Sequence, residues 1–291
     1  MKKLILFALC MIFLVGGVIA PGPNLHLDVL DTSLAEMNDT LIAGIINENY
    51  DACLAGLSYA DVGIFEYWTN FKSYKELHGY NTVDEMLRIA RNDRDRAFTY
   101  CYKIHLAGDG ISHNFYIPAA IKRTKLPNYI THPPQELMVE GHYLDPRANR
   151  LMERSEEFDW LVEKATGRDW SPEARRLNTI LGGGQFYDKA YAPDTSTFMG
   201  KFQKVLYTGV GKFVSEEKSV DLRELMIEET KAVFRGETSS LDPSGEEALR
   251  SADESTQLWL YGGSIVLIIV LFYLSFRWSL IGWNKNKFKF R

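Results

Sequence analysis

Three side chains in the stretch HLAGDGISH can bind a metal ion: His105, Asp109 and His113. They recur at intervals of four residues, so an α-helix would place them on one face. The same face continues back through Cys101 and Ala97, which predicts that it points into the protein interior. A buried carboxylate needs a counter-charge or a metal ion. The stripe is therefore either a buried polar cluster or part of a metal site.

A second pair with the same spacing follows in the sequence, His132 and Glu136. Imidazole and carboxylate together form a ligand set that suits zinc. A single histidine on an apolar face is usually an ordinary core residue. Three such groups at strict intervals, followed by an HxxxE pair, favour metal binding instead.

Helical patterns dominate the segments that must position these side chains. Thr82 and Glu85 have the spacing of a capping box, and a break is expected around Asn92–Asp95. No alternating β-branched stretch is long enough to require a sheet. The prediction is an all-α, multi-helix domain. The helices are expected at 34–49, 82–110, 132–145, 171–184, 195–214 and 219–236.

Both ends of the chain carry an apolar run. Residues 1–20 begin with lysines and end in small residues, which is typical of a signal peptide, with an uncleaved anchor as the alternative. Residues 258–276 carry no charge and are long enough for a transmembrane helix, and the tail at 277–291 is basic. The positive-inside rule places this tail in the cytoplasm and the domain, 21–234, outside the cell membrane. The polar stretch 235–257 is predicted as a linker.

The segment predicted to lie outside the membrane, 21–257, is acidic. It contains all 38 Asp and Glu residues and 26 of the 33 Lys and Arg residues, a net charge of −12 compared with −5 for the whole chain. Proteins that bind nucleic acid through its phosphates carry the opposite charge. Nucleic acid is therefore not favoured as a partner.

Two of the three cysteines, Cys53 and Cys101, lie inside the predicted domain. An exported domain allows them to form a disulfide, and two buried free thiols are the alternative. So few cysteines do not indicate a fold that depends on disulfides.

The candidate ligands follow one another in a definite order: His26 in NLHLDVL, Asp61 in AGLSYAD, His78 in KELHGYN, His105 and Asp109 in HxxxD, His113, and His132 and Glu136 in HxxxE. This order resembles the zinc-dependent phospholipase C family, whose domain also occurs in phospholipase D acting on glycosylphosphatidylinositol anchors. The resemblance covers about Asn24–Asp145. Ala60 stands where the family has a proline before the aspartate. The best-known secreted members use a tryptophan directly after the signal peptide as a ligand, and this chain has none there.

The resemblance implies an all-α fold, related to P1 nuclease, around two or three zinc ions. The implied ligands are His78, His105 and Asp109 for one ion; His113, His132 and Glu136 for a second; and His26, with Asp109 bridging, for a third.

Other positions have alternative roles. Glu140 lies one turn beyond Glu136 and is the alternative ligand, although Glu136 matches the spacing from His132. Asp61 is predicted to be the general base, or a further ligand. His142 is expected to be exposed or to lie behind the ligands. A group of aromatic residues could line a substrate cleft, but core positions are commoner for such residues: Tyr59, Phe65, Tyr67, Trp68 and Tyr116.

These features predict a membrane-anchored zinc-dependent phosphodiesterase of the phospholipase C type, acting on phospholipid or a related phosphate ester. Clustered zinc ions activate water and neutralise the charge that develops on phosphoryl oxygens. The sequence has no G-x-S-x-G motif and no P-loop. The alternatives are a zinc nuclease or nucleotidase on the related fold, and a non-catalytic surface protein stabilised by zinc.

Overall fold

A computed structural model of the chain is helical, and the residues that it describes contain no strand. The all-α prediction is confirmed for this part of the chain. The structure describes residues 23–63, 71–124, 155–168 and 216–254, together with positions 128, 131, 132, 135, 136, 139, 142, 143, 145 and 147.

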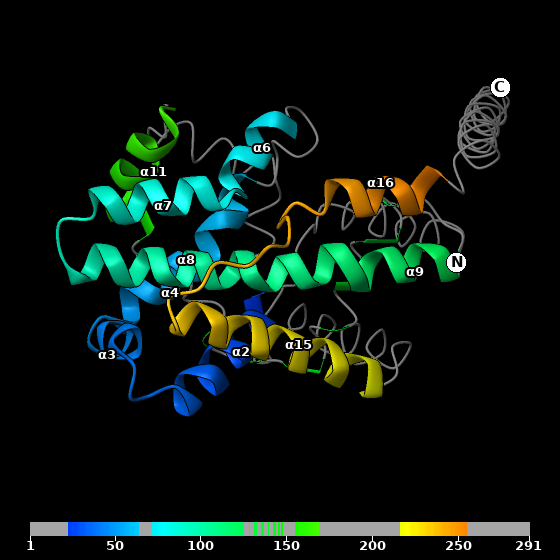
Figure 1. Ribbon diagram of the computed structural model, residues 1–291, viewed down its shortest axis with the longest axis horizontal. Coiled ribbons are helices and arrows are strands. Elements are labelled where there is room, and N and C mark those ends of the chain that lie inside the picture. Colours follow the sequence, from blue (N-terminus) through cyan, green and yellow to red (C-terminus); the bar gives the residue numbers. More distant parts are fainter. Residues whose placement is uncertain are drawn as a thin grey trace, which may run out of the picture.

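One helix, α8 (Asp93–Ile111), runs through the middle of the molecule and continues into α9 (Ile117–Thr124) (Figure 1). The Asn92 side chain caps α8 by accepting a hydrogen bond from the backbone N–H of Asp95. The expected break near this cap is confirmed, because the preceding helix α7 (Tyr80–Ile89) ends before it.

Thr82 does not have the capping role expected of it. It lies inside α7, and its hydroxyl donates to the backbone carbonyl of Glu76, while Gly79 occupies the N-cap position. The capping-box spacing of Thr82 and Glu85 is therefore a coincidence within a continuous helix.

Helices cover α8 on several sides. The segment expected as one helix at 34–49 forms two, because a turn separates α2 (Pro23–Glu36) from α3 (Leu41–Glu48), which Thr40 caps. In Figure 1, α2, α3 and α15 (Glu216–Phe234) lie below α8, and α7, α11 (Asp159–Thr166) and α16 (Glu246–Glu254) lie above it. Residues of α2, α3, α7, α11 and α15 form the buried apolar core together with residues of α8, whereas α16 packs on α9.

A disulfide joins Cys53 of α4 (Tyr50–Tyr59) to Cys101 of α8. Both residues are fully buried within the apolar core. Of the two alternatives for these cysteines, the structure has the paired one, and it fixes α4 against the helix that carries the stripe of candidate ligands.

The stretch predicted as a linker, 235–257, packs against the domain as far as Glu254. Its helix α16 buries Leu249 against Ile117 and Ile121 of α9. Lys75 of α6 (Phe71–Leu77) also donates to the carboxylate of Glu246 at the start of α16.

Several predicted segments lie outside the described residues: the signal peptide at 1–20, the transmembrane helix at 258–276, the basic tail at 277–291, and the helices at 171–184 and 195–214. Within the described part of the chain, no helix combines the length and the apolar character that a membrane span needs.

Candidate metal centre

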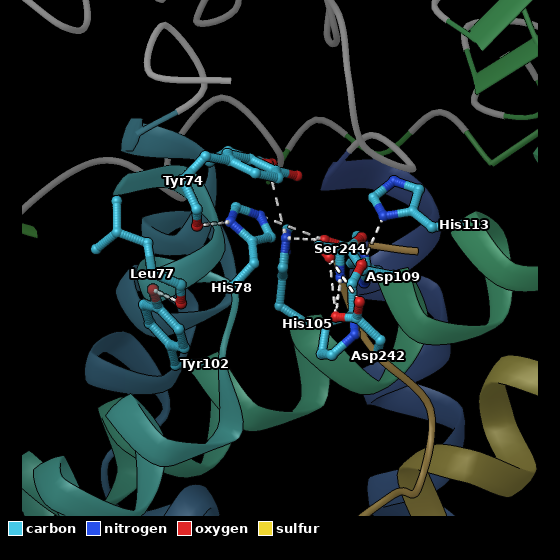
Figure 2. A network of polar contacts seen from close by, with 12 residues as sticks. Tyr74, Leu77, His78, Tyr102, His105, Asp109, His113, Asp242 and Ser244 are labelled. Carbon is cyan, nitrogen blue, oxygen red and sulfur yellow. Dashed lines mark hydrogen bonds and ion pairs between the residues drawn. The ribbon is translucent and has the colours of Figure 1, made fainter. Parts of the chain in front are cut away.

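Asp109 lies near the end of α8 and is fully buried, with three imidazoles around it. Its Oδ1 is 3.4 Å from Nε2 of His26 on α2, and its Oδ2 is 3.5 Å from Nε2 of His78, which follows α6. One turn earlier on α8, Nε2 of His105 is 3.1 Å from the same Oδ2. Figure 2 shows His78 and His105 pointing toward Asp109. The structure thus brings together residues that are far apart in the sequence.

Gly108 is what allows His26 to approach α8. A Cβ atom at this position would lie only 2.6 Å from Cε1 of the His26 ring and 2.9 Å from its Nδ1. The imidazole therefore packs directly on the helix backbone, where it also stacks on His105 with 4.3 Å between ring centroids.

Asp61 reaches the same group from the 3₁₀ turn Ala60–Gly63, which directly follows α4. Its Oδ1 lies 3.6 Å from Nε2 of His105, and its side chain is 20% exposed, whereas that of Asp109 is not exposed at all. The ligand atoms of Asp61, His78 and His105 all lie within 4.8 Å of one another. Asp61 is therefore the carboxylate on the solvent side of this group.

A second group consists of His113, His132 and Glu136. Oε1 of Glu136 is 2.6 Å from Nε2 of His132 and 3.8 Å from Nε2 of His113. His113 is buried within a π-helical turn, Ser112–Tyr116, between α8 and α9. Such turns are rare and frequently occur at functional sites. The HxxxE pair and the last histidine of the stripe therefore meet, a grouping that only the family resemblance implied.

Backbone carbonyls fix the orientation of three of the rings. Nδ1 of His105 lies 2.7 Å from the carbonyl oxygen of Leu57, and Nδ1 of His113 lies 2.6 Å from that of Pro243. Nδ1 of His78 lies 3.3 Å from the carbonyl oxygen of Tyr74. A carbonyl can only accept, so each Nδ1 must donate. When the ring is neutral, the lone pair is then on Nε2, the atom that faces the carboxylates, and metal-binding histidines commonly have this arrangement.

Buried atoms without hydrogen-bond partners concentrate at these residues, although buried polar groups are normally paired. The N···O separations around Asp109 and between His105 and Asp61 are 3.1–3.6 Å. Two ligands about 2.0–2.1 Å from one tetrahedral ion would be roughly 3.3–3.4 Å apart. These buried groups could therefore hold a metal ion. The unpartnered atoms are both ring nitrogens of His26, Oδ1 of Asp61, Nε2 of His78 and His105, both oxygens of Asp109 and Oε2 of Glu136.

The side chains around Asp109 form the first group, which also contains His26, Asp61, His78 and His105. Its charge state depends mainly on whether His105 carries a second proton. Burial alone would raise the pKa of Asp109, but His105 and His26 hold it well below its usual value. Burial alone would lower the pKa of His105, but Asp109 and Asp61 raise it to about 9. Burial raises the pKa of Asp61 to about 7, although His105 opposes this change. Without metal, His105 is therefore an imidazolium at neutral pH, beside the Asp109 carboxylate and an Asp61 side chain that is only partly ionised.

The remaining histidines of the first group are neutral. Burial and the nearby His105 lower the pKa of His26 to about 4. Burial lowers the pKa of His78 to about 3. Both rings are therefore in the protonation state that binds a metal ion. In the second group, burial raises the pKa of Glu136 well above its usual value, so its carboxyl group must lose a proton before it can bind a metal ion.

Several predicted positions lie elsewhere. His142 is exposed, and Glu140 lies outside the described residues, as do Phe65, Tyr67 and Trp68. Of the other aromatic residues proposed for a cleft, Tyr59 is a core residue whose hydroxyl donates to Asp159.

Sequence reasoning missed the carbonyl groups of Leu57, Tyr74 and Pro243. Every residue has a carbonyl, so the sequence contained no signal for them, apart from the turn-forming residues DPSG around Pro243.

No family model, no curated protein and no solved structure matches this chain. The candidate metal centre is therefore defined by the arrangement of the chain's own side chains.

Proposed function

We propose that this chain is a zinc-dependent phosphodiesterase of the phospholipase C type, held at the cell membrane with its domain outside. The observation that carries the proposal is the convergence of buried Nε2 and carboxylate oxygen atoms that have no hydrogen-bond partner of their own. A purely structural polar cluster would satisfy these atoms with each other.

The donor set favours zinc over harder cations. Mg²⁺ and Ca²⁺ prefer sites built from oxygen ligands, whereas nitrogen from imidazole combined with carboxylate oxygen suits zinc. Zinc on one side of the centre would bind to His26, His78, His105 and Asp109. Zinc on the other side would bind to His113, His132 and Glu136. Bound zinc would supply a Lewis acid that lowers the pKa of water and offsets negative charge on a phosphate ester.

The side chains of the chain itself divide into two roles. Asp109 is fully enclosed by imidazoles, so it holds its neighbours in place and does not meet a substrate. Asp61 is partly exposed and has a pKa raised to about 7. Nearby cations would lower that pKa and keep the carboxylate ionised. It is then positioned to accept a proton from water at the solvent side of the group.

Substitution of Asp61 tests this role. Asp61→Asn keeps the size of the side chain but cannot accept the proton, so hydrolysis of a phosphodiester should fall by about 10²–10⁴. The zinc content should stay close to that of the wild type. The exposed Asp39, in the turn between α2 and α3, provides the control variant Asp39→Asn.

The assay follows headgroup release from mixed phospholipid vesicles and hydrolysis of a soluble aryl phosphodiester, with zinc measured on the same samples. Loss of zinc in step with activity would make Asp61 a ligand and not a base. If the wild type binds zinc fully and hydrolyses neither substrate, the alternative is favoured, namely a non-catalytic surface protein that zinc stabilises.

The proposed location has support of its own. The Cys53–Cys101 disulfide suits an oxidising compartment outside the cytoplasm. Protease added to intact cells should release a fragment that includes α16, because this helix packs on α9. A domain that stays intact until the cells are lysed would reverse the proposed topology.

A further inference from the structure

The chain between α15 and α16 crosses α8 (Figure 1). It then reaches His113 of the second group, through the backbone carbonyl of Pro243. We call this segment, Gly236–Gly245, the strap. At its beginning, Nζ of Lys103 donates to the carbonyl oxygen of Glu237 at 2.8 Å and to the hydroxyl of Thr238 at 2.9 Å. Lys103 is only 5% exposed, and a buried ammonium group is costly unless it is hydrogen-bonded. The lysine therefore holds the strap against α8.

The middle of the strap packs closely on the helix beside Asp109. A Cβ atom at Gly110 would lie 3.2 Å from Cβ of Leu241. The side-chain amide of Asn114 donates to the carbonyl oxygen of Asp242 at 2.7 Å and to that of Gly110 at 2.8 Å. Asn114 thus joins the strap to the helix from the π-helical turn.

The end of the strap holds His113 directly. The carbonyl oxygen of Pro243 accepts the Nδ1 proton of the ring at 2.6 Å. Gly245 has a positive φ of 57°, and a Cβ atom there would lie 2.4 Å from Cβ of His113. The carboxylate of Asp242 accepts from both the backbone N–H and the hydroxyl of Ser244, which closes the turn between these contacts (Figure 2).

We propose that the strap is a positioning element for His113, and that Lys103 is a positioning residue that acts through it. The strap keeps the Nδ1 proton on the side of Pro243, so that the Nε2 lone pair faces Glu136. Lys103 precedes His113 by ten residues, about 15 Å along a helix, and so acts without touching the ring. The inference rests on the proposed function in one respect, namely that His113 is a metal ligand.

Two glycines provide a matched test. Gly245→Ala adds a methyl group that must push the strap away from His113. Gly167→Ala has a similar backbone cost, because its φ is 68°, but its Cβ would meet nothing within 4 Å. The full-length protein is labelled with ¹⁵N-histidine, and long-range ¹H–¹⁵N spectra report the tautomer of each ring before metal is added. Binding of ¹¹³Cd²⁺ then gives a separate resonance and affinity for each site.

In the wild type, the neutral tautomer of His113 should be the one with its proton on Nδ1. Gly245→Ala should give a mixture of tautomers and weaken cadmium binding at the His113 group by about 10–100-fold, the effect typical of losing a partner behind a ligand. The signals of His105 should stay in place in this variant, and Gly167→Ala should match the wild type.

Lys103→Met should change the His113 signals in the same direction, whereas Lys231→Met should not. Lys231 is the matched control because it also binds other parts of the chain through its ammonium group. Its partners are the carboxylates of Glu36 and Glu228, which lie outside the strap. Unchanged His113 signals in both Gly245→Ala and Lys103→Met would overturn the proposal. Changes spread equally over all ring signals would also overturn it, since they would indicate a general structural role. If Gly245→Ala changes His113 but the wild type binds no metal, the proposed function fails and the positioning of His113 stands.

Discussion

Gly108→Ala should remove metal by displacing a ligand that is far away in the sequence. The added Cβ would lie 2.6 Å from Cε1 of His26 and 2.6 Å from Cε of Met226. Ordinary contacts begin at 3.4 Å, so the neighbours must retreat by almost 1 Å. The end of Met226 is flexible, but the His26 ring lies against His105 and the helix backbone. A ligand must stay within about 0.2 Å of its bond length, so this displacement breaks the contact.

Gly108→Ala should lower the free energy of unfolding only slightly, but it should lower the zinc content strongly. Replacing a glycine inside a helix by alanine stabilises it by about 1 kcal/mol, whereas overpacking a core costs about 1–3 kcal/mol. The free energy of unfolding should therefore fall by about 0–2 kcal/mol. Zinc content should fall by roughly one ion per chain, because bond distances tolerate far less movement than packing does.

The control is Gly44→Ala on α3, where a Cβ atom would meet nothing within 4 Å. The free energy of unfolding of this variant should rise by up to about 1 kcal/mol, and the variant should keep all of its zinc. Urea unfolding of the metal-free proteins and elemental analysis of the loaded ones measure both quantities. The reasoning is refuted if Gly108→Ala keeps the full zinc content and is stabilised like Gly44→Ala.

Four further predictions concern the disulfide, the pH dependence of zinc affinity, the pH dependence of stability, and the central carboxylate. Breaking the Cys53–Cys101 bond, which closes a loop with a sequence separation of 48, should lower the free energy of unfolding by about 4 kcal/mol; equal urea midpoints with and without reductant would contradict this. Below pH 9 metal must displace the proton of His105, whose pKa is about 9, so zinc affinity should rise with pH up to that value and calorimetry in buffers of different ionisation enthalpy should detect proton release. In the metal-free protein the contribution of His26 to stability should fall as the pH drops from 6.5 toward 4, because the pKa of His26 is lowered to about 4 and the unfolded chain takes up a proton that the folded chain excludes; a stability difference between the wild type and His26→Gln that stays constant over this range would be inconsistent with the buried neutral ring. Asp109→Asn should lose more zinc than the exposed-site variant His142→Ala, and equal zinc contents would argue against Asp109 as the shared ligand.

The sequence was informative wherever one helix determines the geometry. His105 and Asp109 share a face because of their spacing, and the structure places their side chains together. The break before Asp93 could also be predicted, because a capping asparagine is a local signal. His26 and His78 are different, since only their order relative to the other motifs pointed to them.

The remaining features depend on contacts between distant segments. The stretch after α15 is polar and has no aromatic residues, so it has the composition of a linker, yet Lys103 and Asn114 hold it on α8. The acceptors in the strap include backbone carbonyls, which carry no signature in a sequence. The π-helical turn that carries His113 was also not predicted, since its residues continue an ordinary helical pattern.

Zinc content is the measurement that tests the central claim most directly. The full-length protein would be expressed in zinc-supplemented medium, purified, dialysed against metal-free buffer and analysed for zinc per chain. The two groups around Asp109 and Glu136 predict at least two zinc ions. A correctly folded chain, with its disulfide formed, that retains less than one zinc ion would contradict the account.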